Sequence, residues 1–230
     1  MNTKKIKALI AVRSGSIRVE NKNIRPFCES NLLSLKVKQL LSITRLSGVV
    51  VNSNDPAMLD IAKSLGAETI LREPYFSSNT VSMSDVYANM AAAMDCSDIM
   101  YANATNPLVL TSTYETAIDA YLNLEDSYDS LASVCSVKEF LWLDGKPINY
   151  DLSHQPRSQD LPNITMLTFA ISILPKYLMI ERKNVVGFKP RLFSMDEIES
   201  WDIDTNLDFY VAQHLYQQLR INHRRLEDII

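Results

Sequence analysis

The stretch IKALIAV at residues 6–12, followed directly by RSGSIRVENKN at residues 13–23, decides the fold class of this chain. The first part is an almost unbroken apolar run, which is typical of a strand covered on both faces of a parallel sheet. The run ends at Arg13, so it is too short for a signal peptide or a membrane span. We therefore expect a buried first strand that delivers a polar, basic loop to its carboxyl end.

Similar apolar runs recur along the chain and alternate with helical patterns. Further strands are expected at residues 48–52, 68–71, 98–102 and 130–137. Helices are expected between them at residues 35–46, 56–66, 82–94 and 112–124. This alternation predicts an α/β fold with a mostly parallel sheet and helices on both faces. Such sheets bind ligands beyond the carboxyl ends of their strands.

Helix boundaries carry their own sequence patterns. Asp55 before Pro56 is typical of a helix start, and Gly66 is placed to end that helix. Two pairs show the spacing of a capping box, in which a hydroxyl residue is followed three positions later by an acid: Ser82 with Asp85, and Ser112 with Glu115.

The alternation breaks between residues 138 and 168. Pro147, Pro156 and Pro162 interrupt any long element there, so the segment is expected to be an inserted arm within a single domain spanning residues 1–230. A strand is expected to resume at residues 169–174. A terminal helix at residues 206–219 and a charged tail at 222–230 follow.

The composition is that of an ordinary globular protein. The 230 residues are 47% hydrophobic and carry a formal net charge of −4, which excludes a chain-wide basic field for nucleic acid. The three cysteines, Cys28, Cys96 and Cys135, are widely spaced and form neither a disulfide framework nor a zinc motif. We expect a cytoplasmic protein with no membrane partner.

The loop at residues 13–23 has the composition of a phosphate-binding loop. Backbone N–H groups near Gly15 can converge on oxygen atoms, while Arg13, Arg18 and Lys22 offset negative charge. The loop is neither a Walker loop nor a GxGxxG turn. A solvated loop with a few basic residues is the alternative.

Asp202 and Asp204 flank Ile203, and Thr205 follows them. In an extended segment the two carboxylates share a face while Ile203 points into the core, and a divalent cation would relieve their repulsion. Thr205 then caps the next helix, with Asp208 at the reciprocal position. The alternative is that these acids only complement the helix dipole, a role that Asp208 fits best.

Two more loops hold polar candidates. Arg157, in the proline-bracketed segment at residues 155–162, either grips an anion or forms a surface salt bridge. Asn103, Thr105 and Asn106 follow the expected strand at residues 98–102, where they could hydrogen-bond a ligand or serve only the turn before Pro107.

Taken together, these segments resemble the acylneuraminate cytidylyltransferase family, the synthetases of CMP-sialic acid and CMP-Kdo. The family's ARSGSKGLPNKNI stands here as VRSGSIRVENKNI at residues 12–24, its LxPTSPL region as YANATNPL at 101–108, its RQDLP as RSQDLP at 157–162 and its SIDIDT as SWDIDT at 200–205. The motifs are collinear and span nearly the whole chain. The resemblance implies a Rossmann-like domain with a dimerisation arm, and a homodimer.

The resemblance also implies the chemistry. CMP passes from CTP to an acidic sugar acceptor, such as sialic acid or a related nonulosonic acid, pyrophosphate leaves, and Mg²⁺ is the cofactor. The implied catalytic residues are Arg13, Lys22 and Asp204, and the implied metal ligands are Asp202 and Asp204. The implied nucleotide-binding residues are Arg13, Ser14, Gly15, Ser16, Lys22, Asn23, Arg72 and Ser82. The implied acceptor-binding residues are Asn103, Thr105, Arg157 and Gln159.

The chain departs from the family pattern in two places. In the phosphate loop, Ile17, Arg18 and Glu20 stand where the family has Lys, Gly and Pro. On the acceptor side, Leu143, Met166 and the pair Thr168–Phe169 replace basic residues and an Asn–Gly pair. The alternatives are therefore a cytidylyltransferase for Kdo, a phosphonate or another small anion, or an inactive nucleotide-binding relative.

Overall fold

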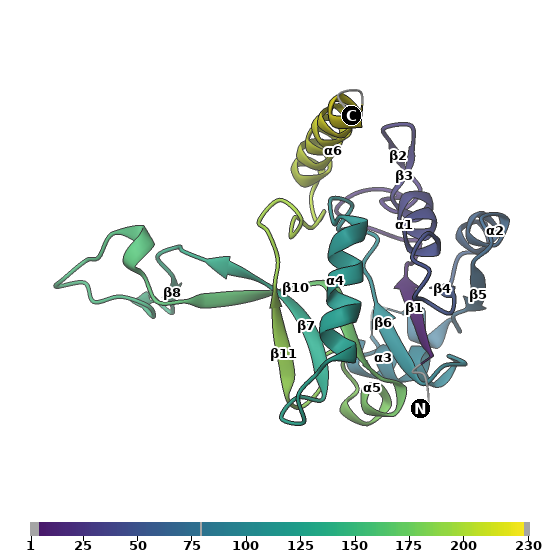
Figure 1. Ribbon diagram of the computed structural model, residues 1–230, viewed down its shortest axis with the longest axis horizontal. Helices are drawn as coiled ribbons and strands as arrows, with labels where there is room; N and C mark the ends of the chain where they lie inside the picture. The colour runs from purple at the N-terminus through teal and green to yellow at the C-terminus, as the bar shows by residue number, and fades with distance from the viewer. Residues whose placement is uncertain (1–4, 79, 228–230) are drawn as a thin grey trace.

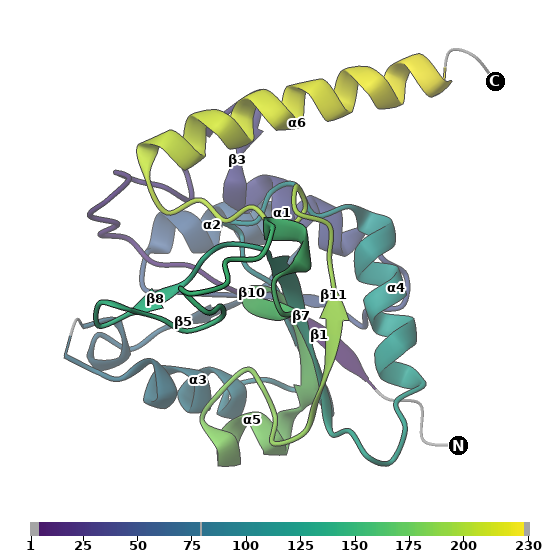
Figure 2. The same ribbon diagram turned by 90° about the vertical axis from the view of Figure 1, so that its left-hand side faces the viewer.

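The computed structural model describes residues 5–78 and 80–227, with side chains through residue 219. Its centre is a seven-stranded sheet with the strand order β11-β7-β10-β6-β1-β4-β5. An arm projects from one side of this sheet (Figure 1), and a long helix, α6, runs across the top of the molecule (Figure 2). None of the helices in the described part of the chain is long and apolar enough to cross a membrane.

The sheet strands are β1 (Ile6–Ala11), β4 (Val49–Ser53), β5 (Glu68–Leu71), β6 (Asp98–Tyr101), β7 (Ser130–Val137), β10 (Ile164–Pro175) and β11 (Pro190–Ser194). Short strand pairs are β2 (Pro26–Phe27) with β3 (Ser30–Asn31), and β8 (Trp142–Leu143) with β9 (Lys146–Pro147). The α-helices are α1 (Leu32–Leu41), α2 (Pro56–Ser64), α3 (Met83–Ala92), α4 (Thr111–Leu122), α5 (Lys176–Arg182) and α6 (Asn206–Glu227). Two 3₁₀ turns, η1 (Tyr75–Ser77) and η2 (Ser158–Asp160), complete the set.

The α/β prediction is confirmed, since the sheet is mostly parallel and helices cover both faces. Strand β1 pairs in parallel with β4 and β6, and only β10 runs antiparallel to its neighbours. Helices α1, α2 and α4 pack in one apolar cluster on one face, while α3 and α5 pack in a second cluster on the other (Figure 2). Because β1 lies between both helix layers, both of its faces are buried, and its side chains are therefore apolar almost without interruption.

Two of the expected helix starts are confirmed, whereas the helix expected at residues 35–46 is α1, which begins at Leu32 and ends at Leu41. The Asp55 side chain accepts a hydrogen bond from Ala57 N at the start of α2, and Ser82 Oγ accepts one from Asp85 N at the start of α3. Gly66 follows α2 with a φ of +95°, a conformation that favours glycine.

The capping box expected at Ser112 and Glu115 is wrong. Helix α4 begins at Thr111, and its cap residue, Leu110, has no capping side chain. Instead, Leu110 N donates a hydrogen bond of 2.9 Å to Glu199 Oε2, a partner distant in sequence.

The last third of the chain also differs from expectation. Strand β10 begins at Ile164 rather than at residue 169, while α5 and β11 were not expected. Helix α6 continues to Glu227. The prediction that the helix ends at residue 219 and that a charged tail starts at residue 222 is therefore wrong as far as residue 227. Residues 1–4, 79 and 228–230 lie outside the described residues. The edge strand β11 was missed because its side chains are mostly exposed and show no apolar run.

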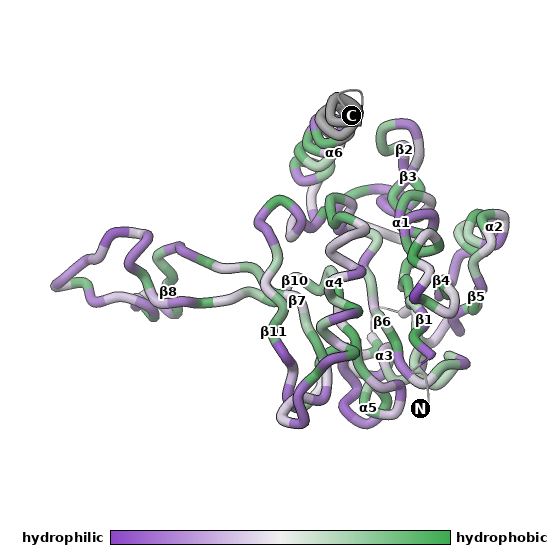
Figure 3. The backbone as a smooth tube through the Cα atoms, in the orientation of Figure 1, coloured by the Kyte–Doolittle hydropathy of each residue, from purple (hydrophilic) through white to green (hydrophobic). Residues whose placement is uncertain are grey.

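The segment at residues 138–168, which we predict to be an inserted arm, extends away from the sheet, and the paired ends of β7 and β10 form its base (Figure 1). The register between the two strands shifts between Leu167 and Ser172, and Phe169 takes a left-handed conformation there with a φ of +54°. Beyond this base the arm contains β8, β9 and η2, and apolar and polar stretches alternate along it (Figure 3).

Two buried hydroxyls hold the shifted register at the base of the arm. Ser133 Oγ accepts a 2.9 Å hydrogen bond from Ile171 N, and it lies 2.6 Å from Thr168 Oγ1. Both residues are at least 95% buried, at 1% and 5% exposure. These bonds therefore replace ladder bonds that the register shift removes.

We predict that Ser133→Ala lowers the free energy of unfolding by about 1–3 kcal/mol, because Ile171 N is left buried without its acceptor. Chemical denaturation measures this change. The matched control is Ser136→Ala, which alters an exposed serine of the same strand and should change stability by less than about 0.5 kcal/mol. Equal effects of the two substitutions would contradict the role given to Ser133.

Candidate functional site

A cleft of about 630 Å³ opens at the carboxyl ends of β1 and β6, where the fold class predicts a ligand site. One end of the cleft is polar and carries three basic side chains, and the other is apolar. The polar end is lined by Arg13, Ser16, Arg18, Lys22, Asn23, Asn103, Thr105 and Asp204. The apolar end is lined by Phe76, Val81, Met83, Val86, Met90 and Tyr101.

The loop after β1 is shaped by a few local contacts. Gly15 has a φ of +81°, and the Ser14 backbone N–H donates to Asn54 Oδ1 at 3.1 Å. A turn follows in which Ile24 N and Arg25 N donate to Asn21 O. Val19 is buried, so the loop is attached to the protein at its centre while its basic side chains face the cleft.

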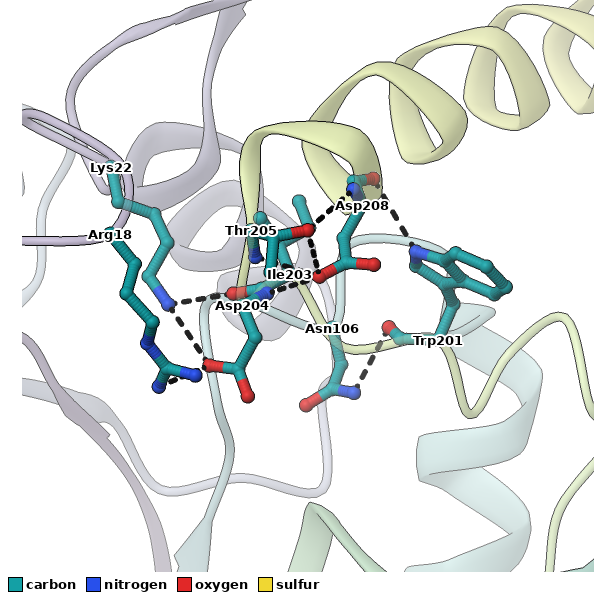
Figure 4. A network of polar contacts seen from close by, with 8 residues as sticks. All are labelled: Arg18, Lys22, Asn106, Trp201, Ile203, Asp204, Thr205 and Asp208. Carbon is teal, nitrogen blue, oxygen red and sulfur yellow. Dashed lines mark hydrogen bonds and ion pairs between the residues drawn. The ribbon is translucent and has the colours of Figure 1, made fainter.

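The basic loop meets Asp204, one member of the acidic pair, at the cleft; Asp202 does not line it. Arg18 Nη2 lies 2.9 Å from Asp204 Oδ1, and Lys22 Nζ lies 3.8 Å from the same oxygen (Figure 4). Lys22 Nζ also donates a 2.6 Å hydrogen bond to Ile203 O. Segments separated by about 180 residues of sequence therefore form one polar site.

The segment that carries Asp202 and Asp204 is held from both sides. Ile203 is fully buried, as the alternating pattern predicts, and its N–H donates to Thr105 O at 2.9 Å. The predicted helix cap is confirmed. Asp208 Oδ2 accepts from Thr205 N at 2.7 Å, and Thr205 Oγ1 accepts from Asp208 N at 3.3 Å. Asp208 thus serves the helix start, so that role does not account for Asp202 and Asp204.

Burial and charge act against each other in this site. Desolvation lowers the pKa of Lys22, although Asp202 and Asp204 partly offset the effect. Desolvation raises the pKa of Asp202, and repulsion from Asp204 adds to it, while a hydrogen bond from Thr105 opposes the rise. The acidic pair therefore gains from any added positive charge.

The donor set fits a hard divalent cation such as Mg²⁺. Asp202 and Asp204 supply carboxylate oxygens two residues apart, although Asp204 Oδ1 is already paired with Arg18. Within the described residues, no group of three or more His, Cys, Asp or Glu side chains could enclose a metal ion. Mg²⁺ commonly takes one or two carboxylates and fills its remaining positions with water and substrate phosphate oxygens. The two acids suit that mode of binding.

Arg72 connects three strands beneath the apolar end of the cleft. Its guanidinium donates to Asn52 Oδ1 at 2.6 Å, to Asn52 O at 3.1 Å and to Val12 O at 3.3 Å. Desolvation lowers its pKa. Ser82 lies beside the cleft between Val81 and Met83, but its hydroxyl is engaged in capping α3.

The expected acceptor residues lie in two separate places. Asn103 and Thr105 line the cleft. Arg157 and Gln159 lie in the arm and do not line it, and Arg157 Nε donates to Asp160 Oδ2 at 2.7 Å, which is the surface salt bridge considered above as the alternative. Glu20 lines a separate hollow with Arg25 and Asn206 and does not line the cleft.

Sequence reasoning missed the apolar end of the cleft. Val86 and Met90 lie on α3, and Phe76 lies in η1, where single apolar residues are indistinguishable from core positions. In the sequence, the only indication of this apolar end was the expected position of α3 next to the strand ends.

Comparison with known proteins identifies the relatives of this chain. The sequence profile of a family described as cytidylyltransferase matches residues 7–218. Post-translational flagellin modification protein B of Campylobacter coli is 22% identical over 222 residues, which cover 91% of this chain and 94% of that protein. Pseudaminic acid cytidylyltransferase of Campylobacter jejuni is 24% identical, with 94% and 96% coverage. N-acylneuraminate cytidylyltransferase of Oncorhynchus mykiss is 25% identical, with coverage of 90% of this chain and 49% of that enzyme.

Solved structures share the fold at low sequence identity. A CMP:2-keto-3-deoxy-manno-octonic acid synthetase in complex with CTP superposes with a TM-score of 0.65 at 12% identity, covering 93% of this chain and 99% of that one. The 4-diphosphocytidyl-2C-methyl-D-erythritol synthase of Anaerococcus prevotii gives a TM-score of 0.69 at 11% identity, with 94% and 97% coverage.

We predict that Asp202→Asn stabilises the protein at pH 7 in the absence of ligands. The raised pKa means that the folded state holds a proton more tightly than the unfolded state, so ionisation of Asp202 costs stability as the pH rises above its ordinary value of 3.8. The advantage of the variant should therefore shrink as the pH falls toward 4. Thermal unfolding across this range measures it.

The matched control is Glu197→Gln, which removes one charge from an exposed position on the same segment and should give no such pH dependence. An Asp202→Asn variant that is less stable than the parent at pH 7 would contradict the electrostatic account.

Proposed function

Because this chain belongs to the cytidylyltransferase family, we propose that it transfers CMP from CTP to an acidic sugar of the nonulosonic type and releases pyrophosphate. The observation that carries the proposal is the contact of Arg18 and Lys22 with Asp204, at 2.9 and 3.8 Å, beside an apolar recess. The cationic loop suits a triphosphate, and the apolar recess suits a pyrimidine base.

The nucleotide would lie along the cleft in one direction. Its base fits among Val86, Met90 and Tyr101, and its phosphates reach Arg13, Ser16 and Lys22. Lys22 is held by Ile203 O, so its charge is placed before the nucleotide arrives. Preorganised charges of this kind supply most of the catalysis in phosphoryl-type transfers.

In the reaction, a hydroxyl oxygen of the acceptor attacks the α-phosphorus of CTP. The new P–O bond forms while the bond from that phosphorus to the bridging oxygen breaks, and pyrophosphate leaves with the electron pair. The hydroxyl proton is lost to solvent. Mg²⁺, when bound by Asp202 and Asp204, would neutralise phosphate charge. Arg13 and Lys22 stabilise the charge that accumulates on the leaving group.

The acceptor is assigned from the relatives and from the polar end of the cleft. Two related proteins are named for N-acylneuraminate and pseudaminic acid transfer, and Asn103 and Thr105 offer hydrogen bonds beside Asp204. Kdo, a phosphonate or another small anion is the second candidate, favoured by the apolar Leu143 and Met166 at positions that are basic in the family. An acceptor panel separates these two classes.

The arm offers a surface for a second copy of this chain. Trp142, Leu143, Ile148, Leu152 and Met166 expose large apolar side chains, each at least 51% accessible. An apolar surface of this kind is typical of a subunit interface. We therefore propose a homodimer in which Arg157, carried by the arm, contributes to acceptor binding. Sedimentation of the full chain as a strict monomer would contradict the dimer.

We predict that the purified protein releases pyrophosphate from CTP when given Mg²⁺ and a nonulosonic acid, and that Asp204→Ala reduces this rate by at least about 100-fold because a charged metal ligand is lost. A coupled pyrophosphate assay measures both. Circular dichroism should show an intact fold in the variant.

Glu197→Ala is the matched control, since it removes an exposed acid from the same segment, and it should keep the parent rate. CTP binding without turnover on any acceptor would favour an inactive relative. Near-parent activity of Asp204→Ala would overturn the metal assignment.

We predict that Arg157→Ala raises the KM for the acceptor by about tenfold while leaving the KM for CTP within about twofold, because the guanidinium meets only the acceptor's charge. Initial-rate measurements with each substrate varied in turn test this. Arg182→Ala, a change at an exposed arginine of α5, is the control. An equal rise in both KM values would refute the division of roles.

A further inference from the structure

Lys36 on α1 is a buried cation that the proposed reaction does not use directly. Lys36 is 1% exposed, and its ammonium group donates hydrogen bonds to three acceptors. The distances are 2.7 Å to Tyr114 Oη, 3.0 Å to Asn106 O and 3.1 Å to Gln39 Oε1. All three ammonium protons are therefore used inside the protein.

Desolvation lowers the pKa of Lys36 to about 7, and the negative charge of Glu199 partly offsets this effect. Burying such a group costs stability unless it is fully bonded. A buried amine that is held by three hydrogen bonds at this cost is a candidate for a role beyond packing.

The contact with Asn106 leads from Lys36 to the acidic pair. Asn106 is fully buried, and its Nδ2 donates to Trp201 O at 3.1 Å, with Ser200 O at 3.5 Å (Figure 4). Among the described residues, no donor reaches the buried Oδ1 of Asn106. The position of Asn106 thus depends on Lys36 at its backbone and on Trp201 at its side chain.

A second set of hydrogen bonds connects the same three segments. Gln39, one turn along α1, donates from Nε2 to Val109 O at 2.6 Å, and Glu199 accepts from Leu110 N at 2.9 Å. Residues 106–110 are therefore fastened to α1 on one side and to residues 199–201 on the other. Asp202 follows those residues directly.

We propose that Lys36 is a positioning residue, which fixes, through Asn106, the segment that presents Asp202 and Asp204 to the nucleotide site. This inference rests on the proposed function for its catalytic readout, but its structural readout is independent of activity. Outer residues that orient metal ligands commonly affect metal affinity or activity by about 10–100-fold when altered.

The experiment compares Lys36→Met with Lys38→Met, which changes an exposed lysine of the same helix. The first readout is the fluorescence of Trp201, measured without ligands in a Trp142→Phe background, since the chain has only these two tryptophans. Lys36→Met should shift the Trp201 emission and increase its quenching by acrylamide, and Lys38→Met should not.

The second readout is kinetic. Lys36→Met should lower kcat by about tenfold and raise the Mg²⁺ concentration needed for half-maximal rate, with the acceptor KM unchanged. Its melting temperature is expected to fall modestly, because the substitution removes the desolvation cost of the amine but leaves Asn106 O and Tyr114 Oη without this donor. A purely structural role would give the same fall in melting temperature and leave the Mg²⁺ dependence unchanged.

The route through Asn106 is tested by a double substitution. In an Asn106→Ala background, Lys36→Met should cause no further change in Trp201 fluorescence, because the connection is already broken. If Lys36→Met does not fold, Lys36→Gln, which keeps an amide donor but no charge, is measured in its place.

Parent-like fluorescence and parent-like Mg²⁺ dependence in the folded variant would overturn the proposal. Fully additive effects of Lys36→Met and Asn106→Ala would overturn the route. If the parent protein transfers CMP to no acceptor, the proposed function fails, while the fluorescence comparison still decides whether Lys36 positions the segment.

Discussion

The burial of one isoleucine determines the geometry of the site. Ile203 is fully buried in a small apolar cluster with Val19, Phe27, Leu32, Phe209 and Ala212. Val19 lies at the centre of the basic loop, and Ile203 lies between Asp202 and Asp204. Packing these two side chains together brings opposite charges face to face without relying on their attraction, which is weak near solvent. The hydrophobic packing therefore sets the distance between the basic loop and the acidic pair, and the ion pairs form at that distance.

The same arrangement explains why the site is electrostatically strained yet ordered. Asp204 is paired with Arg18, while Asp202 keeps a raised pKa and Lys22 a lowered one. A triphosphate with its cation would bring both charges that this site lacks, negative for Arg18 and Lys22 and positive for the acids. Under the proposed function, a bound nucleotide would therefore complete the pairing of these charges, and preorganised sites favour charged ligands in this way.

Local patterns predicted much of this structure, and the failures have physical causes. The run at residues 6–12, the cap at Asp55 and the Thr205–Asp208 box depend on neighbouring residues, so sequence reasoning identified them correctly. The cap of α4 at Leu110 depends on Glu199, nearly ninety residues away, and no local pattern could reveal it. The basic and acidic halves of the site were both predicted, but their contact, the apolar recess on α3 and the buried bonds of Lys36 arise only from tertiary packing.

Strand β10 has a consequence for how this fold can change. It returns from the arm directly beside β7, the strand that leads out, and then continues between β7 and β6 in the sheet. The chain therefore leaves and re-enters the body at adjacent points, and loop closure becomes only slowly costlier as a loop grows. Insertions or deletions at the tip of the arm can alter its reach and its chemistry while the strands that carry the cleft keep their register. Diversification of the molecule is thus expected to concentrate at the tip of the arm, away from the strands that carry the cleft.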